Sequence, residues 1–196
     1  MKHRQMREST SHAIMDAFWD LYRDKPIEKI TVKAICENAG CNRSTFYEYY
    51  TDSYSVLEAI EEELLDYVRR KLTEELPASL AKSFPEIRLD AETLAPLADM
   101  YREKGAYFSI LTGEKGDPYF QYKYKQTVKE LLTHMLDDPA KKFDLSASII
   151  AEFTASALIG AFNCWYPHRE EYSAEKYAML LVSLLTNGVL PAIQKL

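Results

Sequence analysis

The chain of 196 residues lacks most of the signals that mark membrane proteins, secreted proteins and common enzymes. No uninterrupted apolar run reaches the roughly 18 residues expected of a membrane span. The basic first residues are not followed by the apolar stretch of a secretory signal. With 6 glycines in all, the chain has no phosphate-binding loop, and it contains no HExxH or GxSxG motif. We therefore expect a cytoplasmic protein that is not an enzyme.

Cysteine is also scarce. The three cysteines, Cys36, Cys41 and Cys164, are odd in number and do not have the spacing of a zinc site. In the cytoplasm such residues are reduced thiols, and we expect no metal and no cofactor. An enzymatic alternative would have to use Cys164 and His168 with Glu171, although Pro167 breaks the helix between the first two.

Positive charge is in short supply for a nucleic-acid-binding protein, because the formal net charge is -6. The excess of acid is unevenly distributed along the chain. Up to Asp52, eight basic residues balance eight acidic ones, so the whole negative excess lies in the remainder. The N-terminal part is therefore neutral, and phosphate contacts by Lys and Arg would be few.

Helical periodicity is present almost throughout, and no segment has the alternation of a strand. After a basic arm at residues 1–6, we expect helices at 7–23, 32–39, 43–50, 52–76, 91–104, 106–112, 119–136, 145–166 and 173–194. Proline-, glycine- or aspartate-containing breaks separate them, at 77–90, Gly105, 113–118, Asp137–Pro139 and Pro167. The fold class is all-α.

The stretch from Ile30 to Tyr50 organises the rest of the chain. Thr31 is a good N-cap for one short helix, Gly40 can end that helix in the left-handed conformation, and Asn42 can cap the next. Phe46 and Tyr50 lie four residues apart, on the inner face of the second helix. A helix, a glycine turn and a second helix with polar tips predict a helix-turn-helix DNA reader.

The second helix of this motif would enter the major groove of double-stranded operator DNA. Arg43 could form a bidentate contact with guanine, and Thr31 offers a hydroxyl and a helix N-terminus to a phosphate. The predicted DNA-binding residues are Thr31, Lys33, Asn42, Arg43, Ser44, Thr45, Tyr47 and Tyr49. From spacing alone, Tyr47 and Tyr49 could equally be packing residues.

Residues 8 to 60 resemble the tetracycline-repressor (TetR/AcrR) family of bacterial regulators. The matching positions are Thr31-Val32, Ile35, Ala39-Gly40, Thr45-Phe46-Tyr47, Tyr49, Asp52 and Leu57. The resemblance implies phosphate contacts by Tyr47 and Tyr49, and a repressor that leaves its operator when an effector binds the C-terminal domain. The chain departs from the family pattern with Cys41 in place of Val, Asn42 in place of Ser or Thr, Glu48 at a position that is often basic, and Ser53 in place of Lys.

Two domains are expected: a DNA-binding domain at residues 1–52, and a helical effector-binding and dimerisation domain at residues 53–196. A single small reader has little specificity, so a homodimer is expected. Its interface would use the last two helices, through Phe153, Ala157, Gly160, Ala161, Met179, Val182, Ser183 and Thr186. The alternative is that these helices are buried against each other within one monomer.

The input to such a regulator is expected in the middle helices, whose aromatic residues could line a mainly apolar pocket. The predicted lining is Tyr101, Tyr107, Phe108, Tyr119, Phe120 and Tyr122. The same residues could instead be ordinary core. A further alternative is a co-regulator or activator whose C-terminal domain receives a partner protein in place of a small molecule.

Overall fold

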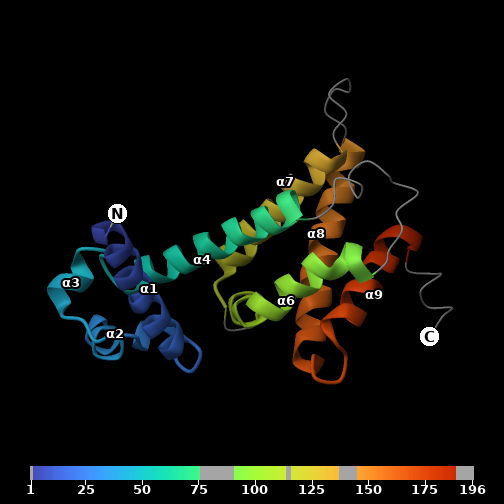
Figure 1. The fold of residues 1–196 in the computed structure, drawn as a ribbon. Helices are drawn as coiled ribbons and strands as arrows, with labels where there is room; N and C mark the ends of the chain where they lie inside the picture. Colours follow the sequence, from blue (N-terminus) through green and yellow to red (C-terminus); the bar gives the residue numbers. More distant parts are fainter. Residues whose placement is uncertain (1, 76–90, 114–115, 137–144, 189–196) are drawn as a thin grey trace. The chain divides into compact units, whose positions relative to one another are not determined.

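The computed structural model describes residues 2–75, 91–113, 116–136 and 145–188. Every regular element in these ranges is helical (Figure 1), which confirms the all-α prediction. The expected linker at 77–90, the stop at Asp137–Pro139 and the expected end of the last helix at residue 194 lie outside the described residues.

The chain divides into two compact units, Met1–Leu64 and Leu65–Leu196. The division falls inside helix α4, which runs from Ser53 to Arg70, whereas the domain boundary expected from the sequence lies at the start of this helix. The first turns of α4 belong with the first unit, and their apolar residues Val56, Leu57 and Ile60 are buried. The helix is therefore shared between the units.

The first unit contains α1 (Lys2–Tyr22), the short η1 turn (Ile27–Lys29), α2 (Val32–Ala39), α3 (Arg43–Tyr47) and the beginning of α4. Side chains from each helix are fully buried: Ile14 and Phe18 of α1, Ile35 of α2, Phe46 of α3 and Val56 of α4. Burial of these large side chains provides the main stabilisation of so small a unit.

Helix α1 begins at Lys2, so the expected free arm at residues 1–6 is wrong. The reason is local: Lys2 to Met6 are all good helix formers except His3, and no proline or glycine interrupts them. Since no helix-breaking residue lies between Lys2 and Arg7, α1 extends towards the N-terminus as far as Lys2.

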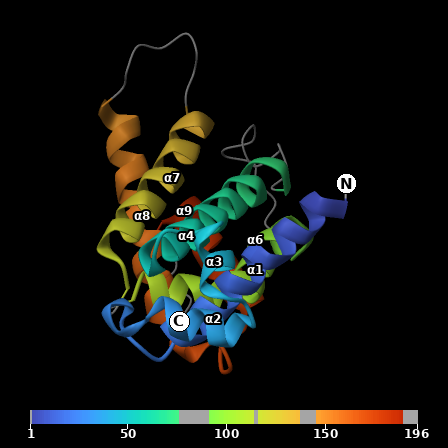
Figure 2. The same cartoon turned by 90° about the vertical axis from the view of Figure 1, so that its left-hand side faces the viewer.

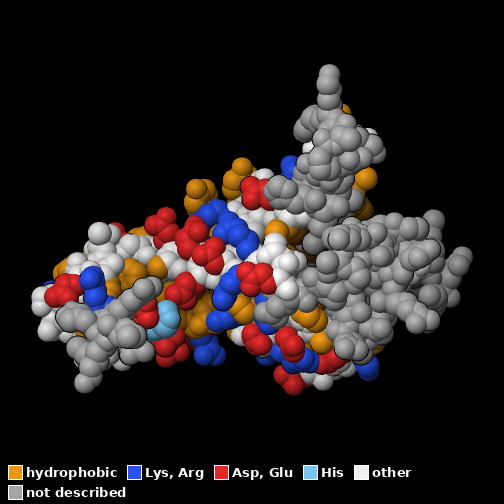
Figure 3. Space-filling view, turned by 45° about the horizontal axis from the view of Figure 1, so that its top comes forward, with side chains coloured by type: hydrophobic (Ala, Val, Ile, Leu, Met, Phe, Trp, Pro, Cys, Tyr) orange, Lys and Arg blue, Asp and Glu red, His pale blue; other side chains and the backbone are white. Residues whose placement is uncertain are grey.

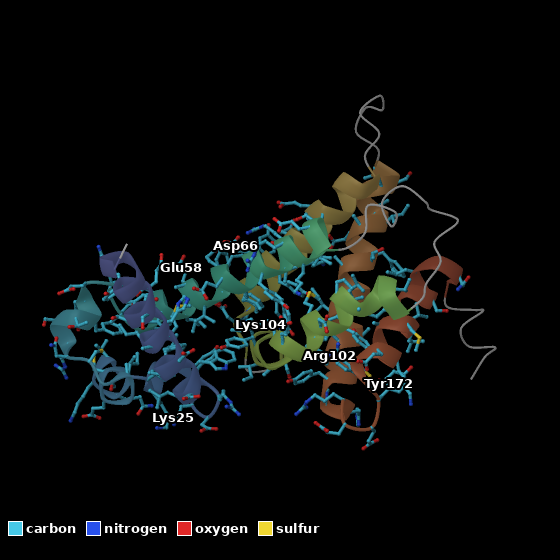
Figure 4. All side chains as sticks on the ribbon, in the orientation of Figure 1. Lys25, Glu58, Asp66, Arg102, Lys104 and Tyr172 are labelled. Atoms are coloured by element: carbon cyan, nitrogen blue, oxygen red, sulfur yellow. The ribbon has the colours of Figure 1, made fainter. Side chains whose placement is uncertain are left out.

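The start of α4 has a reciprocal cap. The backbone N–H of Ser55 donates to Asp52 Oδ1 at 2.8 Å, and Ser55 Oγ accepts from the backbone N–H groups of Thr51 and Asp52. This arrangement is that of a capping box, with Asp52 as the N-cap. It confirms the predicted start of the fourth helix. Glu58 and Asp66, labelled in Figure 4, are exposed on the same helix.

The second unit continues from α4 through the π-helical turn η2 (Lys71–Glu75). It then contains α6 (Ala91–Leu111), α7 (Pro118–Leu136), α8 (Leu145–Trp165), η3 (Tyr166–His168) and α9 (Ala174–Asn187). Helix α7 packs beside α8, as Figure 2 shows, and α6 packs beside α9. Asp117 begins α7 by accepting a hydrogen bond from the N–H of Tyr119, and Ser173 Oγ caps α9.

Gly105 does not break the chain as predicted, because α6 runs through it and through Pro96 without interruption. The glycine is buried against Tyr166, and a Cβ atom at this position would overlap the tyrosine ring. Gly105 is therefore present to allow close packing, not to end a helix.

Helix α8 is the most apolar element. Together with η3 it is long enough and apolar enough to cross a membrane, and it is the one such helix in the described part of the chain. Only 22% of its most apolar window is buried. Length and composition alone are weak evidence for a membrane span.

Candidate nucleic-acid interface and regulatory unit

The turn between α2 and α3 has the geometry that the sequence predicted. Gly40 has a left-handed φ of 64°, and its N–H donates to the carbonyl of Cys36. The Cys41 N–H donates to the same carbonyl at 3.1 Å, which closes the end of α2. Before α2, Thr31 Oγ1 accepts from the Ala34 N–H at 3.2 Å. Both helix ends are therefore defined by short-range hydrogen bonds.

Asn42 begins α3. Its Oδ1 atom accepts from the Thr45 N–H at 2.8 Å and from the Ser44 hydroxyl at 2.6 Å. The N-cap prediction is confirmed. Asn42 Oδ1 and the Ser44 hydroxyl hydrogen are already engaged with each other, so these two side chains would contribute to DNA recognition mainly by holding α3 in place.

Arg43 follows this cap directly and is exposed, as are Thr31 and Lys33 on α2. Thr45 is half-buried. An exposed guanidinium at the leading end of the second helix of the motif can reach the edge of a base, which is the position the sequence analysis assigned to it. The ion pairs described in the first unit are His12–Glu63 and Lys33–Glu37, and neither involves Arg43.

The two tyrosines with predicted phosphate contacts differ in their surroundings. Tyr47 is 58% exposed and has one ring edge against Phe46. Tyr49 is half-buried, and the Arg7 guanidinium lies over its ring at 5.7 Å from the centroid. Tyr47 is thus free to meet a phosphate, whereas Tyr49 also links the end of the motif to α1.

Two aromatic side chains hold the motif from the inside. Phe46 is fully buried and Tyr50 nearly so, with ring centroids 5.9 Å apart. The assignment of both to the core is confirmed. Tyr54, at the start of α4 in the same unit, is 55% exposed and was not predicted as a site residue from the sequence.

The electrostatics of the first unit are weak. Lys33 Nζ lies 3.7 Å from Glu37 Oε1, one turn along α2, so part of its charge is already balanced. The start of α4 adds Glu58, Glu62 and Glu63, all exposed, to a set of residues that was otherwise neutral. On the face shown in Figure 3, acidic and basic side chains are interspersed among the described residues.

The predicted pocket residues of the second unit separate into two groups. Tyr101, Phe108 and Phe120 are buried, and Tyr107 is half-buried with the Lys104 ammonium 5.0 Å from its ring centroid. Tyr119 and Tyr122 are 63% and 59% exposed, on the outside of α7. Phe162 contacts both Tyr101 and Phe108, and Tyr124 contacts both Phe108 and Phe120, so the three buried residues share one aromatic cluster, whereas the two exposed tyrosines face outwards.

Tyr101 lies within a larger aromatic cluster that was only partly foreseen. Its ring contacts those of Phe162, Trp165 and Tyr177, with centroids 5.1 to 5.7 Å apart, and Trp165 stacks on Tyr177 at 4.2 Å. Burial, reinforced by the neighbouring Tyr177 and Tyr124 phenols, raises the pKa of Tyr101 well above its usual value. The cluster is apolar and its phenols stay neutral.

Thr112 connects α6 to α7 and α8 through a small buried network. Its Oγ1 donates towards the Asn163 Oδ1 and Phe108 carbonyl oxygens, each at 2.8 Å. Its own carbonyl accepts from Asn163 Nδ2 at 3.0 Å and from Gln121 Nε2 at 2.7 Å. This network holds the end of α6 at the start of the predicted 113–118 loop. Gly113, Gly116 and Asp117 lie outside the helices as predicted, Pro118 already begins α7, and residues 114–115 lie outside the described part of the chain.

Helix α8 presents an uncovered apolar stripe at helical spacing. Ile149, Phe153, Ala157, Gly160 and Cys164 are all exposed, and Phe153 reaches 70%. Ala161, also on α8, is half-buried. On α9, Met179 and Leu180 are exposed, Ser183 is half-buried, and Val182 is buried within its own unit. The side chain of Thr186 lies outside the described residues. Most of the predicted dimer residues are therefore on the surface of the second unit.

Comparison with known proteins identifies the second unit. Residues 91–187 match the TetR_C_8 model, described as a transcriptional regulator C-terminal region. The chain belongs to the TetR family of DNA-binding transcriptional regulators. A TetR-family chain is not an enzyme, so the alternative that used Cys164, His168 and Glu171 is set aside.

One curated relative is an uncharacterized HTH-type transcriptional regulator, YxbF, of Bacillus subtilis (strain 168). It is 26% identical over 106 residues, which are 54% of this chain. The match spans only about a quarter of that relative, 27% of its length.

Solved structures support the TetR fold at low sequence identity. A putative TetR-family regulator from Syntrophomonas wolfei has a TM-score of 0.69 at 15% identity, with 93% of this chain and 97% of that chain covered. The dihydroxyacetone kinase operon activator DhaS has a TM-score of 0.59 at 22% identity, with 90% and 93% covered. The Thermus thermophilus repressor FadR, solved with lauroyl-CoA, has a TM-score of 0.50 at 21% identity, with 92% and 95% covered.

Proposed function

We propose that this protein is a homodimeric, cytoplasmic repressor that binds a two-fold symmetric operator through α3 and leaves it when an effector binds the second unit. The observation that carries the proposal is the turn at Gly40–Asn42. It begins a short helix whose first residue is an exposed arginine. Such a helix presents its leading residues to base edges in the major groove.

The residues divide into three roles in this proposal. Arg43 reads a base, with Thr45 beside it. Thr31, Lys33, Tyr47 and Tyr49 contact phosphates, and Asn42 with Ser44 holds the helix end that presents Arg43. Only contacts with base edges carry sequence information, so the specificity of one reader is small.

Dimerisation supplies the second reader. The exposed stripe on α8, with Met179 and Leu180 of α9, is an apolar surface of the kind that marks a protein–protein interface. A Cβ atom added at Gly160 would meet no atom within 4 Å, so this side of α8 is open to close approach by another helix. Two chains joined here would present paired readers to half-sites about one helical turn apart, roughly 34 Å.

The effector would bind among the aromatic residues of the second unit. Tyr101, Phe108 and Phe120 offer apolar contact, and Tyr107 with Lys104 lies nearer the surface. This chemistry suits an apolar ligand with a polar end. FadR of Thermus thermophilus binds lauroyl-CoA, and a long-chain acyl thioester is one ligand class to test first.

An activator is the second candidate, because DhaS, whose fold is similar, is named an activator. In that case the second unit could receive a partner protein instead of a small molecule. The two outputs differ in what the bound dimer does to transcription, and they share the same DNA-binding surface.

The test is selection of duplexes from a random pool by the full-length chain, followed by transcription from a template that carries the selected site. The expected result is a palindromic consensus and lower transcription when the protein is added. Higher transcription would favour the activator. A pool that shows no enrichment after repeated rounds would contradict sequence-specific binding. A thermal-shift screen with acyl thioesters then tests the effector, because a ligand that binds only the native state raises the melting temperature.

A further inference from the structure

Two of the three cysteines meet at the turn of the helix-turn-helix motif. Cys36 lies in the last turns of α2 and Cys41 follows the left-handed Gly40. The N–H of Cys41 donates to the carbonyl of Cys36 at 3.1 Å, so the chain folds back and brings residues 36 and 41 together. Side chains at these two positions of a helix end commonly touch.

The surroundings of the two thiols differ. The neighbouring Cys41 thiol is one of the influences that raise the pKa of Cys36. Burial is the largest of them and raises the pKa of Cys36, while the nearby Arg43 guanidinium acts in the opposite direction. Cys36 is 5% exposed, whereas Cys41 is half-buried and reachable by a small reagent.

A simpler reading is that both residues serve as small apolar side chains. That reading accounts for burial at Cys36. It does not use the fact that both of the positions brought together by the helix end carry a thiol, directly before the residue that caps α3.

We propose that Cys36 and Cys41 form a modification site at which hydrogen peroxide converts the thiol pair into an intramolecular disulfide. The Cys41 thiolate attacks a peroxide oxygen, so an S–O bond forms, the O–O bond breaks, and hydroxide leaves and takes up the thiol proton as water. The Cys36 sulfur then attacks the Cys41 sulfenic acid. The S–S bond forms, the S–O bond breaks, and a second water leaves with the Cys36 proton. Two thiols are oxidised and one peroxide is reduced.

Cytoplasmic disulfides are usually transient and redox-sensing, which suits a partly buried pair at a functional turn. Disulfide geometry requires the two Cβ atoms to lie about 3.8 Å apart, so oxidation fixes the turn between α2 and α3. Asn42 and Arg43 follow Cys41 directly. This consequence rests on the proposed function: we expect the oxidised protein to bind its selected duplex at least several-fold more weakly.

The first experiment concerns the thiols alone. The full-length Cys164→Ser variant is treated with hydrogen peroxide and analysed by intact mass and by thiol labelling under denaturing conditions. The expected result is the loss of two hydrogen atoms and of both remaining thiols, with no cross-linked chains and with recovery by dithiothreitol. Oxygen addition at a single cysteine, a disulfide between chains, or two thiols left intact would each overturn the proposal.

The second experiment uses matched variants and the duplex selected by the unmodified protein. Cys41→Val and Cys36→Ala keep an apolar side chain at each position, and each removes one partner of the pair. Both variants should bind the duplex in the absence of peroxide and remain unaffected by it, whereas binding by the Cys164→Ser protein falls. A disulfide that forms without a change in DNA affinity would refute the regulatory consequence. Failure to select any duplex would count against the proposed function. The intact-mass measurement would still show whether Cys36 and Cys41 form the disulfide.

Discussion

The Ser11 hydroxyl of α1 and the Tyr50 hydroxyl at the end of the motif lie 2.8 Å apart and share a hydrogen bond across 39 residues of sequence. Tyr50 also packs on Phe46, so one side chain ties α1 to the inner face of the reader by both packing and a polar contact. Burial is the main influence on the Tyr50 hydroxyl and raises its pKa. The phenol therefore remains a neutral donor or acceptor at physiological pH.

Tyr50→Phe removes this hydrogen bond and keeps the ring. We expect a loss of about 1 kcal/mol in the free energy of unfolding, the usual net contribution of one such bond. Urea titration measures it. Ser11→Ala should cost a similar amount, and the double variant less than the sum of the two, because both changes delete one interaction. Strict additivity would show that the hydrogen bond contributes nothing.

Arg43→Ala should weaken binding to the selected duplex more than binding to random DNA, by about 1–3 kcal/mol for a bidentate base contact. Tyr47→Phe and Thr31→Ala should weaken binding to both DNAs alike, because phosphate contacts carry no sequence information. Fluorescence anisotropy with the two duplexes measures the difference. Equal losses for Arg43→Ala on all sequences would remove its base-reading role.

Phe153→Arg should convert the proposed dimer into a monomer, because it places a charge within the exposed apolar stripe on α8. Tyr122→Arg is the matched control, since Tyr122 is an aromatic side chain of similar exposure on α7 of the same unit. Sedimentation equilibrium distinguishes the species. A Phe153→Arg protein that stays dimeric would place the interface elsewhere.

The Thr112 network allows a test by a double-mutant cycle. Asn163→Ala and Gln121→Ala each remove one donor to the Thr112 carbonyl. Gln121→Ala should cost about 1 kcal/mol because the other donor remains, and Asn163→Ala should cost more because it also removes an acceptor of the Thr112 hydroxyl. The double variant leaves that carbonyl without either side-chain donor and should cost more than the sum. Thermal or urea unfolding of the four proteins measures the coupling. If the double variant costs only the sum of the two single variants in unfolding free energy, the two amides act independently.

The features that could be predicted from sequence are those decided within a few residues. Thr31, Gly40, Asn42 and Asp52 each determine a helix end through a bond to a backbone group at most four positions away. Chemistry at this range is read directly from the order of residues.

The features that were missed depend on distant neighbours. Gly105 reads as a break in sequence and proves to be a packing position, because the ring that covers it belongs to Tyr166. The start of α1 at Lys2 was missed for another reason. The basic residues there suggested a free arm, whereas their high helix propensity extends the helix.

The buried and exposed members of the aromatic run at Tyr119–Tyr124 could have been distinguished from the sequence. Phe120 and Tyr124 are four residues apart, buried and stacked with centroids 6.0 Å apart, while Tyr119 and Tyr122 face outwards. Helical spacing separates these pairs, so grouping all the aromatics as pocket lining ignored the direction in which each one points.

The balance of charge around α3 has a thermodynamic consequence for DNA binding. Lys33 already has Glu37 beside it, Arg7 lies over Tyr49, and Glu58, Glu62 and Glu63 are exposed in the same unit. Each phosphate neutralised by a protein cation releases counterions, and log K falls with log[salt] by about 0.9 per contact. With so few free cations per reader, affinity should respond only shallowly to ionic strength. Such a regulator should stay bound to DNA over a wide range of intracellular salt concentrations. It should discriminate between sequences by the geometry of its base contacts more than by charge.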